Sequence, residues 1–210
     1  MPKVSTREYR TMPVLTRAME PAEGAAEPSY KVRGYATTFG EKYVLFEDLD
    51  GDPVYEVIDA GAFAEADMDD VIMQFDHAGM VFARTRNGSL KVGTDEHGLW
   101  IEADLGLTEE SRKLYDAIDK GLIDRMSFCF TIEEERFDKA TKTSTIYRIG
   151  KLYDVSAVSI PANPGTEIAP ERMKRMDGEI QEARAERLAE DIRRRKIKIL
   201  RAKSKAVKAM

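Results

Sequence analysis

The sequence offers few side chains that could carry out a reaction. Cys129 is its only cysteine, and His77 and His97 are its only histidines. The chain therefore cannot form an intrachain disulfide, a cysteine-rich zinc site or a multi-histidine metal site. The remaining catalytic option is a hydroxyl nucleophile activated by a histidine, because a neutral hydroxyl must give its proton to a base in order to attack.

His77 is the natural base for such a pair. It stands at the end of the apolar run 71–77, which predicts a strand. A histidine at a strand end can equally serve as a hydrogen-bonding structural residue, so His77 alone identifies no site. His97 is predicted at the tip of a hairpin between strands 89–92 and 99–105, which makes it a surface residue.

Residues 126–133 alternate between apolar and small polar side chains, with the period of two that a β-strand requires. One face of this predicted strand is therefore apolar, and the other carries small nucleophilic groups. The side chains on the second face are those of Ser127, Cys129 and Thr131.

The predicted last strand of the core, residues 152–160, carries a carboxylate on an otherwise apolar face. Asp154 and Ser156 share that face with Leu152, Val158 and Ile160. Burying a carboxylate without a partner is unfavourable. We therefore expect Asp154 to hold a polar neighbour in place.

Further elements follow from the same patterns. Strands are predicted over 30–39 and 54–58, a short helix over 60–66 capped by Asp59, and a helix over 109–120 capped by Thr108. The acidic turn 47–53 lacks EF-hand spacing and a terminal glutamate, which favours a surface turn over a calcium loop. Six or more short strands with two short helices predict an α+β or mostly β domain, closed as a barrel or sandwich.

The two ends of the chain differ from this domain, which is predicted over residues 29–168. Residues 1–28 contain four prolines and an Ala/Glu/Gly-rich patch, and are predicted to form a flexible N-terminal arm. Residues 169–210 are predicted to form a basic helical tail that bends or breaks at Gly178 and is too polar to join the core.

Charge is distributed unevenly along the chain. The net charge is −5, yet residues 171–210 carry 14 Lys and Arg against 7 Asp and Glu, which leaves −12 on the first 170 residues. The nine basic residues from Arg193 onward suit either a negatively charged partner or simple solvation. A membrane or exported protein is not expected, because no apolar stretch reaches about 20 residues and the start lacks an apolar signal segment.

Seven short motifs follow one another along residues 30–164. They are VRGYA at 32–36, EVIDAGAF at 56–63, FDH at 75–77, GSL at 88–90, GLW at 98–100, GLIDRMSFCF at 121–130 and YDVSAVSIPANP at 153–164. In this order they resemble the prohead maturation serine protease family of tailed bacteriophages. That family is similar in fold to the herpesvirus capsid-assembly protease, so the resemblance implies a closed or partly closed β-barrel with short helices.

The resemblance also implies a catalytic triad. The family's histidine falls on His77, and its serine, in a Gly-x-Ile-x-x-x-Ser-Phe-x-Phe pattern, falls on Ser127. The acidic residue that the family shows before a Val-Ser pair falls on Asp154. The related herpesvirus enzymes use a second histidine, so His97 is the alternative third member. Asp154 is favoured because a carboxylate fixes the tautomer of the base and stabilises the imidazolium.

Two positions depart from the family pattern. Cys129 stands where the family commonly has glycine, and Arg84 follows an alanine where the family often has glycine. Arg84 or Arg125 is the candidate for an oxyanion contact. The competing interpretation of either arginine is a surface ion pair.

The function implied by the resemblance is a serine endopeptidase that processes capsid and scaffold proteins during prohead assembly and maturation, inside the assembling prohead in the host cytoplasm. The implied substrates are the scaffolding segment of the major capsid protein and the protease's own tail. No cofactor is implied, a homodimer is a further hypothesis, and neither a membrane nor a nucleic acid is expected as a partner. The alternative function is a non-enzymatic scaffold or capsid-assembly factor that works through the basic helical tail.

Overall fold

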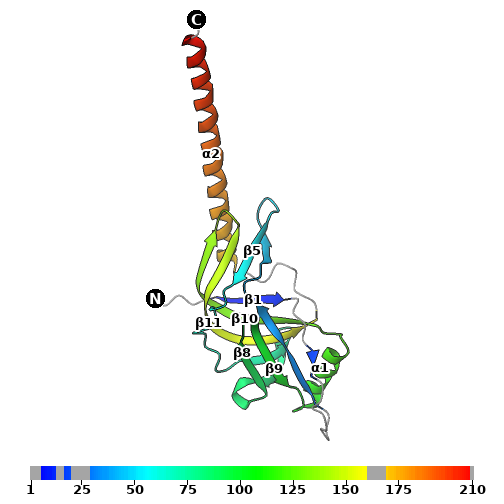
Figure 1. Cartoon of the computed structure of the whole chain (residues 1–210). Coiled ribbons are helices and arrows are strands. Elements are labelled where there is room, and N and C mark those ends of the chain that lie inside the picture. The colour runs from blue at the N-terminus through cyan, green and yellow to red at the C-terminus, as the bar shows by residue number, and fades with distance from the viewer. Residues whose placement is uncertain (1–5, 13–16, 20–28, 160–168, 209–210) are drawn as a thin grey trace.

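The computed structural model describes residues 6–12, 17–19, 29–159 and 169–208, and its strands form two sheets (Figure 1). In the first sheet the order is β1, β10, β11, β5, β4, and β6 and β7 continue from another part of β11. Its strands are β1 Arg7–Met12, β4 Tyr43–Glu47, β5 Pro53–Ile58, β6 Ile72–Phe75, β7 Ala78–Arg84, β10 Arg125–Asp138 and β11 Thr143–Val158. The second sheet has the order β2 Arg17–Ala18, β3 Lys31–Thr38, β9 Gly98–Asp104, β8 Leu90–Thr94.

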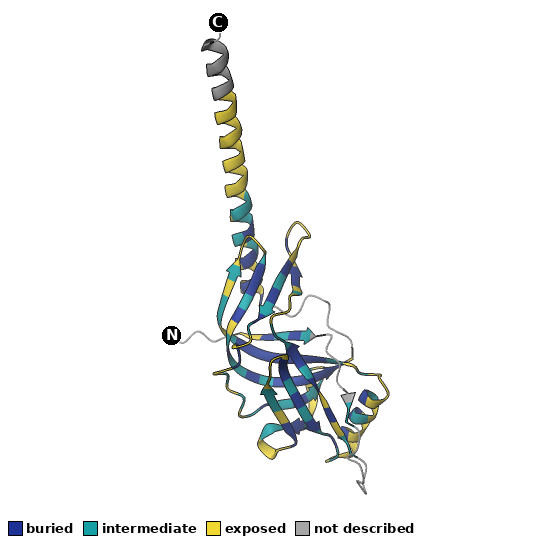
Figure 2. Cartoon of the chain, viewed as in Figure 1, coloured by how far each residue is buried: buried dark blue, intermediate teal, exposed yellow. Residues whose placement is uncertain are grey.

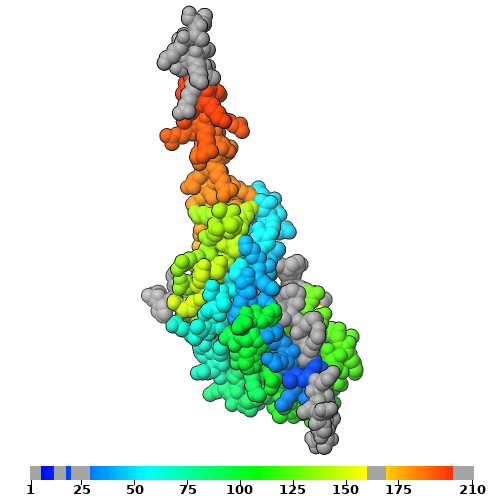
Figure 3. Space-filling view, viewed as in Figure 1, coloured from blue at the N-terminus to red at the C-terminus, as the bar shows by residue number. Residues whose placement is uncertain are grey.

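Within the described residues, two α-helices and one short 3₁₀ helix, Thr85–Asn87, accompany the sheets. Helix α1 spans Glu109–Asp119, and the side chain of Thr108 caps it by accepting a hydrogen bond from the backbone N–H of Ser111. This confirms the helix and the cap predicted from the sequence. Helix α2 spans Pro170–Lys208 and projects from the body of the molecule (Figures 1 and 3).

Apolar side chains from both sheets and from α1 form one buried core. Phe128 of β10, Val155 of β11, Ile101 of β9 and Leu114 of α1 all belong to it. The rings of Phe128 and Phe130 stack with their centroids 4.6 Å apart. Burial of this apolar face of β10 is the driving force that leaves the opposite face of the strand free for polar groups.

The α+β, mostly β class is confirmed, with the strands at 30–39 and 54–58 and the hairpin 89–105 close to their predicted positions. Among the described residues, no closed ring of strand pairs joins the two sheets, so the expected barrel is not confirmed. The prediction of a short helix over 60–66 is wrong. Hydrogen bonds from Ala62, Ala64 and Ala66 to carbonyls three residues back close successive turns there instead.

The described part of the N-terminal segment differs from the predicted flexible arm. Residues 7–12 form β1, which pairs antiparallel with β10 from Arg7 opposite Thr131 to Met12 opposite Met126. Strand β2 likewise pairs with β3. Part of the expected arm is thus an edge strand of the first sheet, paired with β10.

The base of α2 also differs from prediction, because it joins the structure. The helix runs without interruption through Gly178, and its side chains Met176 and Ile180 are buried in a second small core with Leu45 and Phe46 of β4. The change from buried to exposed residues along α2 is visible in Figure 2. Residues 185–200 are all exposed, so only that part of the helix fits the expected solvated tail.

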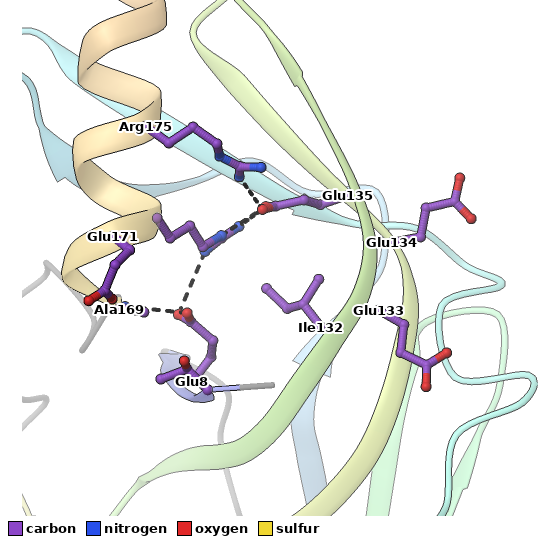
Figure 4. Close-up of a pocket in the computed structure, with 10 residues that line it drawn as sticks. Glu8, Ile132, Glu133, Glu134, Glu135, Ala169, Glu171 and Arg175 are labelled. Carbon is purple, nitrogen blue, oxygen red and sulfur yellow. Dashed lines mark hydrogen bonds and ion pairs between the residues drawn. The ribbon is translucent and has the colours of Figure 1, made fainter. Parts of the chain in front are cut away.

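Buried charges tie the base of α2 to β1. The carboxylate of Glu56 on β5 accepts hydrogen bonds from Arg10 Nε at 2.5 Å and from Arg172 Nη2 at 2.5 Å, and all three side chains are buried. Arg172 also donates to Glu135 at 2.6 Å. Figure 4 shows Glu135 of β10 and Glu8 of β1 pointing toward the base of α2. Because buried charges are tolerated only when paired, these contacts fix where α2 leaves the body.

Acid is expected to weaken this cluster. Burial alone would raise the pKa of Glu56, but the charges of Arg10 and Arg172 outweigh burial and lower the pKa to about 2. In the unfolded chain the pKa of the Glu56 carboxyl is 4.5. The stabilisation from the charged carboxylate is therefore complete above that pH and is lost as the pH falls toward 2. We expect urea-unfolding curves to show a loss on the order of 3 kcal/mol from this group between about pH 5 and 2.

The matched variant for this experiment is Glu56→Gln, which removes the titrating group at the same buried position. Its unfolding free energy should be lower near neutral pH and should fall less steeply with acid, because no carboxylate is left there to protonate. Equal acid slopes in the two proteins would contradict a role for Glu56.

The acidic turn 47–53 engages cations of the chain itself. Lys142 Nζ lies 2.7 Å from the carboxylates of both Asp48 and Asp52. Arg184 of α2 contacts the same two residues. This turn therefore anchors α2, and most of its residues are exposed, as predicted for a surface turn.

Candidate active site

Ser127 lies on an inner strand of the first sheet. Strand β10 runs between β1 and β11, and Ser127 is directly opposite Thr11 on one side and Ser156 on the other. The predicted alternation of β10 holds here, since Met126 and Phe128 are buried in the core and Ser127 faces the other way. Residues on both sides of Ser127 that share its face can reach its hydroxyl.

Asp154 lies on the same face as Ser127, and a β-bulge separates it from the face of Leu152. Cys129 is opposite Asp154 while the next residue, Phe130, is opposite Leu152, so Tyr153 is an extra residue on β11. Leu152 consequently lies with the core and Asp154 lies with Ser127 and Ser156. The predicted shared face of Leu152 and Asp154 is therefore wrong, and the bulge is the reason.

His77 lies in the hairpin formed by β6 and β7, on the side of β11 opposite β10. Strand β6 pairs parallel with β11 from Ile72 opposite Asp154 to Phe75 opposite Ala157. Phe75 is also opposite Ala78 of β7, which leaves Asp76 and His77 as a two-residue turn. Their φ angles are 49° and 54°, as a type I′ hairpin turn requires. The strand predicted over 71–77 therefore ends earlier, at Phe75, and His77 lies in the turn that follows it.

The structure brings the three predicted residues together in one hydrogen-bonded chain. His77 Nε2 lies 2.6 Å from Ser127 Oγ, and His77 Nδ1 lies 2.6 Å from Asp154 Oδ1. The carboxylate accepts a hydrogen bond from Nδ1–H, which leaves Nε2 free to accept a proton from the serine hydroxyl. This arrangement can convert a neutral hydroxyl into a nucleophile.

The chain of hydrogen bonds is largely shielded from water. Ser127 is 1% exposed, and the side chains of His77 and Asp154 are 19% and 9% exposed. Electrostatic interactions are stronger in such an environment than at the surface. The carboxylate can therefore act on the imidazole with little competition from solvent.

Ser156 is a site residue that the sequence left without a role. It is fully buried, and its hydroxyl donates a hydrogen bond of 2.8 Å to Asp154 Oδ1, the oxygen that also contacts His77. Its donation helps hold the carboxylate in place. The signal in the sequence was its spacing of two from Asp154, which places both on one side of the strand.

Replacing Ser156 by alanine is expected to lower the rate at which Ser127 reacts with a serine-directed reagent about tenfold, since a hydrogen bond to a charged group contributes about 1.5 kcal/mol. The measurement is the rate of reaction of Ser127→Ala, Ser156→Ala and unaltered protein with a serine-reactive fluorophosphonate. Ser144→Ala is the control, since Ser144 is equally buried and contacts Glu135 in the cluster at the base of α2. Equal rates for Ser156→Ala and Ser144→Ala would contradict the role of Ser156.

Strand β1 adds Tyr9, which sequence reasoning placed in the flexible arm. Its ring meets the His77 ring edge to face, with centroids 4.8 Å apart. This contact covers one side of the imidazole. No pattern in residues 1–28 predicted that pairing, because the strand that Tyr9 joins lies more than 100 positions further along the chain.

Cys129 is not a competing nucleophile. It is buried opposite Asp154, and burial raises the pKa of its thiol to about 12. The thiol is therefore protonated near neutral pH, whereas thiol attack requires the thiolate.

His97 is separate from this group. It is exposed in the turn between β8 and β9 of the second sheet, where its ring packs against Tyr35 with centroids 4.5 Å apart. The surface position predicted for it is confirmed.

The two arginines proposed as oxyanion contacts both form ion pairs. Arg84 makes two hydrogen bonds of 2.6 Å with Asp70, and Arg125 lies 3.7 Å from Asp124. By alternation along β10, Arg125 shares the face of Ser127. Arg125 therefore lies on the strand face that carries Ser127, whereas Arg84 lies on β7.

Other kinds of site are not evident among the described residues. Within those ranges no group of three or more His, Cys, Asp or Glu side chains is arranged to hold a metal ion, and none of the helices there combines the length and apolar character of a membrane span. The pocket of Figure 4 is lined by residues of β1, β10 and the base of α2, and none of His77, Ser127 and Asp154 lines it.

Comparison with known proteins agrees with the motifs. Residues 16–179 match the family described as caudovirus prohead serine protease. Neither the curated proteins nor the solved structures gave a significant match. The family match spans most of the chain and takes in all three residues of the hydrogen-bonded chain, and this protein therefore belongs to the caudovirus prohead serine proteases.

Proposed function

We propose that this protein is a serine endopeptidase that cleaves capsid protein during phage prohead maturation, with Ser127 as nucleophile, His77 as general base and Asp154 as the residue that orients the imidazole. Membership of the family supports the class of reaction. The observation that carries the residue roles is the unbroken chain of hydrogen bonds from Ser127 through His77 to Asp154.

In the first half of the proposed reaction, Ser127 Oγ attacks the carbonyl carbon of the scissile peptide bond while His77 Nε2 takes the hydroxyl proton. The imidazolium that forms is stabilised by the Asp154 carboxylate, which accepts the Nδ1 proton in a hydrogen bond throughout. The carbon–nitrogen bond then breaks, and Nε2 returns its proton to the leaving amine. The product is an ester between Ser127 and the new carboxyl end of the substrate.

In the second half, a water molecule takes the place of the leaving amine. His77 Nε2 accepts a proton from this water as its oxygen attacks the ester carbonyl. Collapse of the intermediate breaks the bond to Ser127 Oγ, and Nε2 gives the proton back to that oxygen. The enzyme is thereby returned to its starting state with no cofactor consumed.

The proposed substrates are the scaffolding segment of the major capsid protein and the exposed part of α2. Residues 185–200 are solvent-exposed and project from the body (Figure 3). An exposed helix with few tertiary contacts can unwind locally and present an extended segment to a protease.

The test is a timed digestion of the capsid protein encoded with this chain. Untreated enzyme is expected to shorten the capsid protein, and enzyme first inactivated with a fluorophosphonate is expected to leave it intact. A metal chelator and a thiol-alkylating reagent should have no effect, because the proposed reaction uses neither a metal nor Cys129. An intact capsid protein after incubation with untreated enzyme would favour the non-enzymatic scaffold function instead.

A further inference from the structure

We infer that Asp76 is a positioning residue, whose carboxylate fastens the turn that carries His77 to the end of β11, the strand that carries Asp154. The inference rests on the proposed roles of Ser127, His77 and Asp154. Asp76 itself takes no part in the proton transfers.

The turn that carries His77 is unfavourable in isolation. Both of its central residues, Asp76 and His77, have positive φ, a region in which residues other than glycine are uncommon. Asp and His tolerate this region better than most residues, and each still incurs a penalty of about 1 kcal/mol. Neighbouring contacts must therefore hold the turn in this conformation.

Asp76 supplies those contacts with both its backbone and its side chain. Its N–H donates to the carbonyl of Ala157 at 3.0 Å. Its Oδ1 accepts the backbone N–H of Ser159 at 2.9 Å, and its Oδ2 accepts the hydroxyl of Ser159 at 2.9 Å. The two carboxylate oxygens thus fix the side chain in two directions.

These bonds occupy the place where strand pairing has to stop. The ladder between β6 and β11 ends with Phe75 opposite Ala157, because the chain then turns toward β7. The first N–H beyond the end of β11, that of Ser159, is taken up by the Asp76 carboxylate instead of by a backbone carbonyl. The side chain therefore extends the connection between β6 and β11 by one further step.

The position of this connection matters for the reaction. The His77 ring must meet Ser127 of β10 and Asp154 of β11 at the same time, at 2.6 Å from each. A misplacement of about 1 Å at a reacting group can lower a rate about 100-fold. Asp76 and Ser159 are themselves exposed, so the global stability of the fold depends little on their bonds.

The chain contains a matched control for an Asp76 variant. At the end of β10, where the chain turns toward β11, Asp138 accepts hydrogen bonds from the backbone N–H of Ala140 and the hydroxyl of Thr141, both at 2.8 Å. Asp138→Ala therefore removes the same two kinds of hydrogen bond from an exposed turn, at the opposite end of the long hairpin from Ser127. Comparison of the two variants separates the effect of losing contacts in any exposed turn from the effect of losing contacts in the turn that carries His77.

The experiment compares the kinetics of fluorophosphonate labelling in the unaltered protein, Asp76→Ala and Asp138→Ala, with thermal unfolding measured on each. We expect Asp76→Ala to lower the maximal labelling rate about 30- to 100-fold with an unchanged half-saturating probe concentration. Asp138→Ala should stay within about threefold of the unaltered protein. Similar rates for the two variants would overturn the inference.

Conservative substitution separates geometry from charge. Asn also adopts positive φ readily, and its carbonyl oxygen can accept the Ser159 N–H, so Asp76→Asn should recover most of the rate. A loss in Asp76→Asn as large as that in Asp76→Ala would overturn the positioning role. If Asp76→Ala does not fold, Ser159→Ala decides, with a smaller loss of about three- to tenfold expected, because one of the two side-chain bonds remains.

Failure of the proposed function would be recognised separately. If the unaltered protein is labelled no faster than Ser127→Ala, the nucleophile assignment fails whatever Asp76 does. If the unaltered protein is labelled and Ser127→Ala is not, the comparison of Asp76→Ala with Asp138→Ala tests Asp76 alone.

Discussion

Replacing Ser127 by alanine is expected to stop processing of the capsid protein, with a loss of rate on the order of 10⁴-fold or more. The reason is chemical, since alanine offers no oxygen to form the acyl ester. The substitution removes one atom from a buried position in β10 and adds none, so the sheet should keep its pairing. The measurement is the mass of the capsid protein after co-expression with each version of the enzyme.

Ser111→Ala is the matched control for this experiment. Ser111 and Ser127 are both 1% exposed, and each hydroxyl forms hydrogen bonds inside the fold. At the start of α1, the Ser111 hydroxyl forms hydrogen bonds with the Thr108 hydroxyl and with the backbone carbonyl of Phe82 on β7. Ser111→Ala should lose some stability and keep its proteolytic activity. Capsid protein processed equally by Ser127→Ala and Ser111→Ala would show that Ser127 is not the nucleophile.

The second large effect is expected at Asp154. Asp154→Ala should lower the rate on the order of 10⁴-fold, because the imidazole then loses the group that fixes its tautomer and stabilises its positive charge. His97→Ala is the direct comparison, since His97 was the other candidate for the third position. We expect no measurable change in His97→Ala, because its ring lies in the exposed turn against Tyr35. The opposite ranking in a digestion time course would assign the third position to His97.

The alternating strand at 126–133 was predictable from the sequence because a period of two leaves a clear pattern when one face meets a core. Phe128 and Phe130 carry that signal, and Ser127 follows from it. The same reasoning applies to Asp154, since a carboxylate among apolar residues must have a partner. His77 and Ser156 are the partners that the structure supplies.

The bulge at Tyr153 could not be predicted in the same way. An extra residue in a strand changes which side chains share a face, yet it leaves no mark on composition and only a one-residue shift in pattern. Strand β1 was missed for another reason. Its partner β10 lies far along the chain, and short polar strands owe their stability to such pairing more than to their own propensity.

The base of α2 shows a third limit of sequence reasoning. Arg172 falls within residues 169–210, the segment predicted to be too polar to join the core, and arginine is rarely fully buried unless it is paired. In the folded chain it is buried against Glu56 and Glu135. These partners come from β5 and β10, so the burial depends on tertiary structure that local composition does not encode.

The most direct test of the central claim is mass spectrometry of the protein after reaction with a fluorophosphonate. We expect one covalent adduct, on the peptide that contains Ser127, and we expect it to form far more slowly in His77→Ala. An adduct on a different residue, or one that forms at Ser127 equally fast without the imidazole, would contradict the roles of Ser127 and His77.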